Sequence, residues 1–206
     1  ALNKVSFKLN NYSSLAIMGD VGAGKTTILE LICGINNATK GNVLIDNINI
    51  KKHNLNNLRK YIGYVPQNTF LFSDTIENNI LFGKNDAKKN EIILAARSAF
   101  IDKDILKFDK KYKTMLGERG VNLSGGQKQR ISISRALIKN PKILILDDGL
   151  SSVDSETEEI ILKNISNMQR NFTIIMTTNR VSTAKNCDKI MIIENGKITN
   201  IGRHEQ

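Results

Sequence analysis

The glycine-rich segment GDVGAGKTT, residues 19–27, places the tightest constraint on how this chain folds. An apolar run from Leu15 to Met18 ends directly before it, and residues 25–32 have helical character that closes at Gly34. Strand, glycine loop and helix in this order is the setting that a phosphate-binding loop requires. The glycines let consecutive backbone N–H groups point at phosphate oxygens, and the helix adds its positive N-terminal end. We therefore predict a nucleotide site here.

Side chains at the end of this segment carry specific roles in such a loop. Lys25 is expected to reach the β and γ phosphates, and the Thr26 hydroxyl is expected to ligate Mg²⁺. The candidate nucleotide-binding residues of the segment are Gly19, Asp20, Val21, Gly22, Ala23, Gly24, Lys25, Thr26 and Thr27.

A second chemical feature is the segment ILILDD, residues 143–148, where an apolar run ends in two carboxylates. In a sheet of this class ligands bind at the carboxyl ends of the strands, so both acids are expected beside the nucleotide. Asp147 is the expected Mg²⁺ partner, through water, and Asp148 occupies the position of a general base. An acid pair at a strand end can also cap a following helix, but beside a matched phosphate loop the catalytic interpretation is stronger.

A third feature is LSGGQKQR, which begins at Leu123. Ser124 is a good N-cap, and Gly125 and Gly126 leave backbone N–H groups open at the start of a helix that we expect to run through Leu137. Together with Gln127 these residues form a second predicted anion-binding device. Alone, the SGG pattern usually marks a plain turn.

The rest of the chain predicts a single α/β domain over residues 1–206. Strands are expected at 43–45, 62–65, 142–146, 172–176 and 189–193, the last followed by an Asn-Gly turn. Residues 69–139 have helical periodicity and form a predicted helical subdomain, whereas 1–68 and 140–206 form the predicted nucleotide-binding core. Alternating strands and helices imply a mainly parallel sheet covered on both faces. Ser155 and Glu158 match a capping box for a helix with an apolar stripe below it.

Composition narrows the possible partners. The net charge is +10, but basic residues are spread along the whole chain and aromatic residues make up only 5%, so no nucleic-acid partner is predicted. No apolar run approaches the about 20 residues needed to span a bilayer, and we expect the chain as given to be soluble. Cys33 and Cys187 lie far apart without metal-site spacing, and both are expected to be buried.

Five motifs in a fixed order identify a family. GDVGAGKTT, YVPQ at 64–67, LSGGQ at 123–127, ILILDD and SSVD at 151–154 resemble the ATP-binding domain of an ABC transporter over nearly the whole chain. The resemblance implies a P-loop NTPase (RecA-like) core with an inserted helical subdomain. It also implies a truncated N-terminal β region, because the chain begins after the strands that carry the family's adenine-stacking aromatic residue.

In this family two domains sandwich two ATP molecules head to tail, each between one chain's phosphate loop and the other chain's LSGGQ. The resemblance therefore implies ATP and Mg²⁺ as ligands and a second ATP-binding domain as partner. It further implies that Gln67 contacts the metal and the attacking water while sensing the membrane domain, and that Asp154 crosses the dimer interface.

LFSDTIENNILFG at 71–83 and GERG at 117–120 resemble the exporter branch of the family. That branch implies a transmembrane domain as partner and a position at the cytoplasmic face of the cell membrane. Glu118 and Arg119 are candidate residues for coupling to the transmembrane domain, and an ordinary solvated charge pair is the alternative. The transported substrate stays open among lipids, peptides and drugs.

Two positions depart from the family pattern. Asp148 stands where hydrolytic members place Glu, and Asn179 stands where the switch histidine would be. Together they predict an impaired nucleotide site of its own, with a heterodimer favoured over a homodimer. The alternatives are a regulatory clamp that binds ATP with negligible hydrolysis and a soluble ABC ATPase that acts on nucleic acid or the ribosome.

Overall fold

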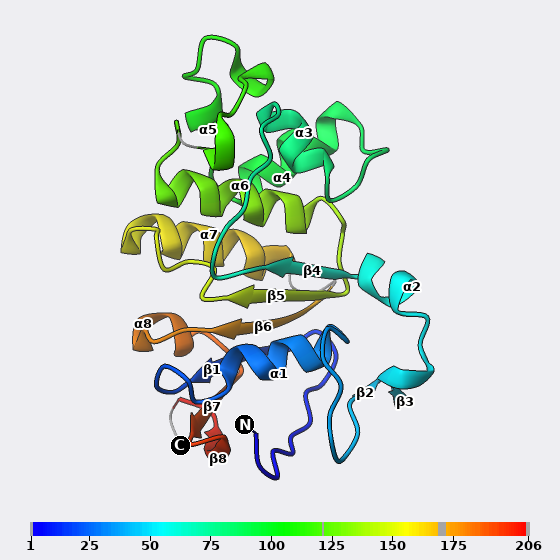
Figure 1. Cartoon of the computed structure of the whole chain (residues 1–206). Coiled ribbons are helices and arrows are strands. Elements are labelled where there is room, and N and C mark those ends of the chain that lie inside the picture. The colour runs from blue at the N-terminus through cyan, green and yellow to red at the C-terminus, as the bar shows by residue number, and fades with distance from the viewer. Residues whose placement is uncertain (1, 121, 169–171, 205–206) are drawn as a thin grey trace.

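The computed structural model describes residues 2–120, 122–168 and 172–204 of the chain. Its centre is a six-stranded sheet with the strand order β4, β5, β6, β1, β7, β8 (Figure 1). Neighbouring strands are parallel except β7 and β8, which form an antiparallel hairpin. The predicted α/β class with a mainly parallel sheet is therefore confirmed. The strands are β1 (Ser14–Met18), β4 (Ile62–Val65), β5 (Ile143–Asp147), β6 (Thr173–Thr177), β7 (Lys189–Glu194) and β8 (Lys197–Gly202).

The inner strands bury both faces, because helices cover the sheet on two sides. In β1, Leu15 and Ile17 pack into one core, and Ala16, between them, packs into the other. Strands β5 and β6 alternate in the same way. A strand whose two faces are both covered needs an apolar residue at every position, and this explains the continuous apolar runs of the sequence.

Helix α1 (Lys25–Ile32) packs Ile28 and Leu29 into the first core. The second core is built by α6 (Gly125–Leu137) and α7 (Ser155–Met168), with Ile131 from α6 and with Ile161 and Ile165 from the predicted stripe of α7. The other α-helices are α2 (Leu55–Lys60), α3 (Ile76–Leu81), α4 (Lys89–Ser98), α5 (Asp102–Ile105) and α8 (Val181–Ala184), and the 3₁₀ helices are η1 (Ile50–Lys52), η2 (Lys111–Lys113) and η3 (Glu118–Gly120).

The segment between β4 and β5 is helical, as its periodicity predicts. Helices α3 to α6 gather at the top of the view in Figure 1, away from β7 and β8 at the bottom. Among the described residues of this segment the extended pairing is a single isolated bridge between Thr75 and Met115. The long helix α6 contacts β4 as well as α3 and α4, so it joins these helices to the sheet.

One hairpin turn and one short strand test the local predictions. Asn195 and Gly196 both have positive φ, 50° and 78°, which is the conformation that a tight hairpin turn requires, so this prediction is confirmed. The strand expected at 43–45 is shorter: β2 (Leu44–Ile45) pairs only with β3 (Ile48–Asn49) in a separate hairpin outside the main sheet.

The predicted capping box at the start of α7 is wrong. The helix begins at Ser155, and the carboxylate of Asp154 accepts a hydrogen bond of 2.9 Å from the backbone N–H of Thr157. Asp154 is therefore the N-cap, one residue earlier than expected, because Asp is as good a cap as Ser. Glu158 therefore does not cap the helix, and its side chain is buried in the protein.

The two thiols give a direct test of the packing. Cys33 and Cys187 are both buried and free, and burial raises the pKa of each to about 12. Because the thiolate is the reactive form, we expect the native chain at pH 8 to react with iodoacetamide at least about a hundredfold more slowly than the urea-unfolded chain. Mass spectrometry of the timed reaction measures both rates. Rapid labelling of either cysteine in the native chain would contradict the packing described here.

Candidate nucleotide site

The phosphate loop connects β1 to α1 with a backbone that only glycine adopts easily. Gly19, Gly22 and Gly24 all have positive φ, at 150°, 83° and 108°. A Cβ atom on Gly19 would lie 2.1 Å from the carbonyl oxygen of Ile193, so β7 and the loop approach each other more closely than any side chain permits. Conformation therefore favours glycine at all three positions, and space also requires it at Gly19.

The loop ends in a helix suited to an anion. Helix α1 begins at Lys25 and has no acidic side chain in its first turn, so its positive N-terminal end is not neutralised. The Lys25 ammonium group donates to the carbonyl oxygens of Gly19, at 2.5 Å, and Asp20, at 3.0 Å. The charge thus lies over the loop, where it can meet the phosphates of ATP.

The side chain of Asp147 connects the elements that form the site. Its carboxylate is buried and accepts hydrogen bonds from Thr26 Oγ1 at 3.2 Å, Thr177 Oγ1 at 2.8 Å and Tyr64 Oη at 3.2 Å. Desolvation, followed by the Asp147 charge, raises the pKa of Tyr64 well above its usual range, so the phenol stays a donor. These three donors come from α1, β6 and β4.

A carboxylate and a hydroxyl in contact suit Mg²⁺, which prefers hard oxygen ligands and keeps several waters. Thr26 and Asp147 would hold the ion together with phosphate oxygens, and the ion would supply charge neutralisation on the phosphates. Gln67, the third predicted metal contact, is exposed and lies two residues after the end of β4.

Asp148 directly follows the strand and has a positive φ of 48°. Its backbone N–H donates to Thr177 Oγ1 at 2.8 Å, and Gln67 Nε2 lies 3.5 Å from its carboxylate. Desolvation raises the pKa of Asp148, while hydrogen bonds from Ser151 and Gln67 act in the opposite direction. The structure thus brings the predicted base and the predicted glutamine together.

Asn179 follows β6 and is exposed. With Asp148, Thr178 and Arg180 it lines a cavity of about 180 Å³. The two positions that depart from the family pattern, residues 148 and 179, therefore border one space.

The LSGGQ segment lies at the start of α6. Ser124 accepts a hydrogen bond of 3.2 Å from the backbone N–H of Gln127, and the Gln127 side chain accepts one of 3.0 Å from the backbone N–H of Ser124. Ser124 as N-cap and a helix through Leu137 are both confirmed. Among the described residues no hydrogen bond or ion pair joins this segment to the phosphate loop. Glu118 is exposed in η3, whereas the side chain of Arg119 lies outside what the structure describes.

Sequence reasoning missed several polar residues of this region. Thr177 could have been found, because the carboxyl ends of parallel strands meet at one edge and Thr177 is the last residue of β6. Gln129, Glu158 and Arg180 gave no such signal, since their partners lie on other elements, far away in the sequence.

Thr177 gives a test of this polar cluster. Replacing Thr177 by Val keeps the shape but removes a donor to Asp147 and the acceptor of the Asp148 N–H, so we expect the free energy of unfolding to fall by about 1 to 3 kcal/mol. Urea unfolding followed by circular dichroism measures it. Thr199→Val, at an exposed position of β8, is the matched control and should change stability by less than about 0.5 kcal/mol. Equal effects of the two variants would contradict the role of Thr177.

Comparison with known proteins agrees with this geometry. A family profile described as ABC transporter matches residues 2–151. The chain is 45% identical over 204 residues to ABC transporter B family member 24, mitochondrial, of Arabidopsis thaliana, covering 99% of this chain and 30% of that protein. It is 47% identical over 205 residues to the multidrug resistance-like ATP-binding protein MdlA of Buchnera aphidicola, covering 99% of this chain and 35% of that protein.

A solved structure described as a bacterial Atm1-family ABC exporter with ATP bound superimposes with a TM-score of 0.96 at 38% identity, covering 99% of this chain and 36% of that one. The chain thus spans about a third of the length of its relatives. Sequence, fold and site agree that this chain belongs to the ABC transporter family, as an ATP-binding domain of the exporter type.

Proposed function

We propose that the chain binds and hydrolyses ATP in an ABC exporter and drives transport by ATP-dependent head-to-tail pairing with a second ATP-binding domain. The observation that carries this proposal is the separation of two anion-binding devices in one chain. The phosphate loop is complete at the start of α1, while the LSGGQ segment begins a different helix with its serine and glycines exposed or half-exposed. A second chain in the opposite orientation would bring each loop to the other's LSGGQ segment.

The length of the relatives and an exposed aromatic cluster support a transmembrane partner. Among the described residues no helix is long and apolar enough to cross a bilayer, and the relatives are about three times longer. Phe70, Phe72 and Phe82 are exposed beside Arg135, whose guanidinium lies 5.5 Å from the Phe72 ring centroid. Exposed aromatic clusters mark interaction sites. This cluster follows Gln67 in the chain and would receive a helix of the transmembrane domain at the cytoplasmic face of the membrane.

Within the domain, residues 1–68 and 140–206 act as the ATP-binding core and residues 69–139 as a helical subdomain that carries LSGGQ. Two chain segments connect the core to the subdomain: the segment after Gln67 and the turn before Pro141. Gln67 thus lies between the nucleotide and the partner surface, where it can report on both.

The chain's own pocket is impaired. The Asp148 carboxylate is one methylene shorter than the glutamate it replaces, and a general base must reach the attacking water within about 3 Å. Asn179 can donate a hydrogen bond to the γ phosphate but supplies neither positive charge nor a titratable proton. Since LSGGQ is intact, the chain completes a competent pocket on a different partner, which favours a heterodimer. ATP as ligand, Mg²⁺ at Thr26, Asp147 and Gln67, and catalysis by Asp148, Gln67 and Asn179 belong to this proposal.

Restoring glutamate at position 148 tests the proposal that the chain's own pocket is impaired. We expect the purified chain to hydrolyse ATP slowly and Asp148→Glu to raise kcat at least about tenfold, because a well-placed general base contributes roughly 10²-fold to 10⁴-fold. Steady-state phosphate release measures kcat, and thermal unfolding of each variant confirms the fold. Asp86→Glu, at an exposed loop position, is the matched control and should leave kcat unchanged. Wild-type turnover typical of the family, with no gain from Asp148→Glu, would refute the impaired site.

The same altered positions also favour a second function, a regulatory clamp that holds ATP without turning it over. ATP turnover by a mixed dimer distinguishes the weak ATPase from the clamp, if the partner chain in that dimer carries a substitution that removes its own general base. A weak ATPase keeps a measurable residual turnover that Asp148→Glu increases, whereas a pure clamp shows essentially none.

A further inference from the structure

A cavity of about 400 Å³ lies beside β4, the outermost strand on one side of the sheet. This volume is within the range of about 300 to 1,000 Å³ that small-molecule sites occupy. Ile62 of β4 forms part of the wall, and two large apolar side chains that also line the cavity, Ile35 and Phe82, are 55% and 61% exposed. Apolar surface is therefore available to a ligand at this place.

Three cations line the same cavity: Arg59 of α2, Arg135 of α6, and Lys139, which lies two residues after the end of α6. Their hydrogen bonds within the described part of the chain go to uncharged oxygens. Arg59 donates to two backbone carbonyl groups directly after α1, at 3.2 and 2.7 Å, and Lys139 donates to two others, at 2.7 and 2.6 Å. Arg135 donates to three backbone or amide oxygens, each at 2.8 Å. These bonds orient the three side chains without neutralising their charges.

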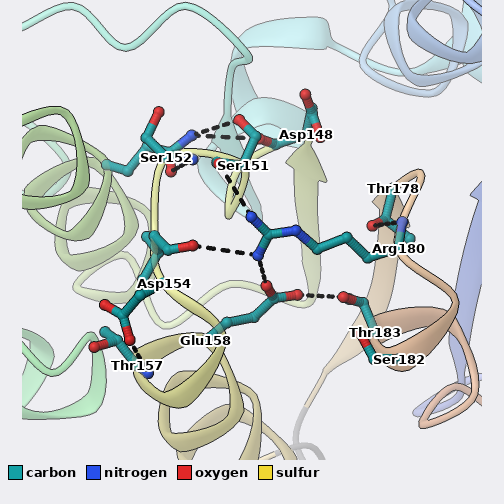
Figure 2. A network of polar contacts seen from close by, with 12 residues as sticks. Asp148, Ser151, Ser152, Asp154, Thr157, Glu158, Thr178, Arg180, Ser182 and Thr183 are labelled. Carbon is teal, nitrogen blue, oxygen red and sulfur yellow. Dashed lines mark hydrogen bonds and ion pairs between the residues drawn. The ribbon is translucent and has the colours of Figure 1, made fainter.

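No carboxylate among the described residues forms an ion pair with any of the three cations. The guanidinium of Arg180, by contrast, is ion-paired with the buried Glu158, as Figure 2 shows. Burial lowers the pKa of Arg135 to about 10 and also lowers the pKa of Lys139, because a desolvated cation without a counter-ion is less stable. A bound anion would offset this cost.

The thiol of Cys33 shows that two of the cations lie close to one point of the cavity wall. Cys33 lines the cavity and is 4% exposed. Burial raises the pKa of this thiol, whereas the charges of Arg59 and Lys139 act in the opposite direction. A carboxylate that enters the cavity beside Cys33 would therefore meet both cations.

We propose that this cavity binds an amphipathic carboxylate, such as a medium-chain fatty acid. The carboxylate lies between Arg59 and Lys139, where spare N–H groups can donate charge-assisted hydrogen bonds. The alkyl chain packs against Ile35 and Phe82. Phe82 also belongs to the aromatic cluster that we propose for the transmembrane partner, so the ligand lies at the border of that surface. Binding itself does not depend on the proposed function of the chain.

Isothermal titration calorimetry of the chain with decanoate, at concentrations where decanoate is monomeric, tests the proposal. We expect one site with a Kd below about 100 μM. Decyltrimethylammonium has the same chain with the opposite charge, and acetate has the same charge without the chain. Each should bind at least about tenfold more weakly, because binding needs both the cations and the apolar wall. Saturating MgATP should change the Kd of decanoate by less than about twofold, since the phosphates of ATP belong at the phosphate loop.

One substitution removes a cation from the cavity. Arg59→Gln keeps an amide donor for the carbonyl groups after α1 but loses the charge, and we expect the Kd of decanoate to rise at least about fivefold, as the loss of a charge-assisted bond implies. Lys163→Gln, at an exposed position of α7 that does not line the cavity, is the matched control and should leave the Kd unchanged.

A second substitution supplies the cavity with a carboxylate of its own. Cys33→Asp should keep the thermal midpoint within about 3 °C of the wild type, because the new charge is paired, and should weaken decanoate binding at least about tenfold. Cys187→Asp is the matched control. Cys187 is also buried, and both burial and the charge of Asp188 raise the pKa of its thiol, so a carboxylate there stays unpaired. We expect its thermal midpoint to fall by at least about 8 °C.

The opposite results would overturn the inference. Equal affinity for decanoate and decyltrimethylammonium would show that the cations do not select an anion, and displacement by MgATP would move the anion to the phosphate loop. Wild-type affinity in Arg59→Gln would remove the cation from the site. A fall of the thermal midpoint in Cys33→Asp as large as in Cys187→Asp would show that the cations do not meet at the cavity. None of these measurements requires ATP turnover, so a failure of the proposed function would be seen separately.

Discussion

The buried carboxylate of Asp147 is the constraint on which the rest of the site depends. A charged group without water must be surrounded by hydrogen-bond donors or a cation, and here the donors are hydroxyls of Thr26, Thr177 and Tyr64. These belong to α1, β6 and β4, so satisfying one side chain fixes the phosphate loop against two strands. The same arrangement creates the place where a metal ion would stand beside the phosphates, and the strand order β4, β5, β6, β1 brings these ends together.

The sequence predicts those features that depend on local chemistry. Apolar runs marked the inner strands because both faces of the sheet are covered, and glycines marked the phosphate loop because Gly19 and Gly24 need positive φ. Ser124 marked the start of α6 because its cap bonds are made within three residues. The failure at Ser155 has a local cause too, since two adjacent residues were equally good caps and only the backbone path decides between them.

The contacts that the sequence did not reveal are those that depend on strand order. β1 lies between β6 and β7, although both follow it by more than 150 residues. The hydrophobic periodicity of the sequence does not predict this strand order. Gln129 and Arg180 both contact the segment of residues 148–154 between β5 and α7 for the same reason: one comes from a helix before β5 and the other from the turn after β6. Gln129 belongs to a motif that was noticed for its glycines, and Arg180 to one that was noticed for Asn179. Their side-chain partners became visible only in three dimensions.

These contacts bear on how a pocket with the proposed impairment could persist. The loop that carries Asp148 also supports the start of α6, through Gln129 and through the close approach of Gly126 to Ser152. Loss of the base need not disturb LSGGQ, because Gln129 binds the backbone carbonyl of Asp148 and not its carboxylate. Under the proposed function, the side chain at residue 148 can therefore change, while the backbone around it stays constrained by the half-site that the chain would lend to its partner. An Asp at this position keeps the left-handed backbone that the loop requires, since Asp adopts positive φ more readily than most residues.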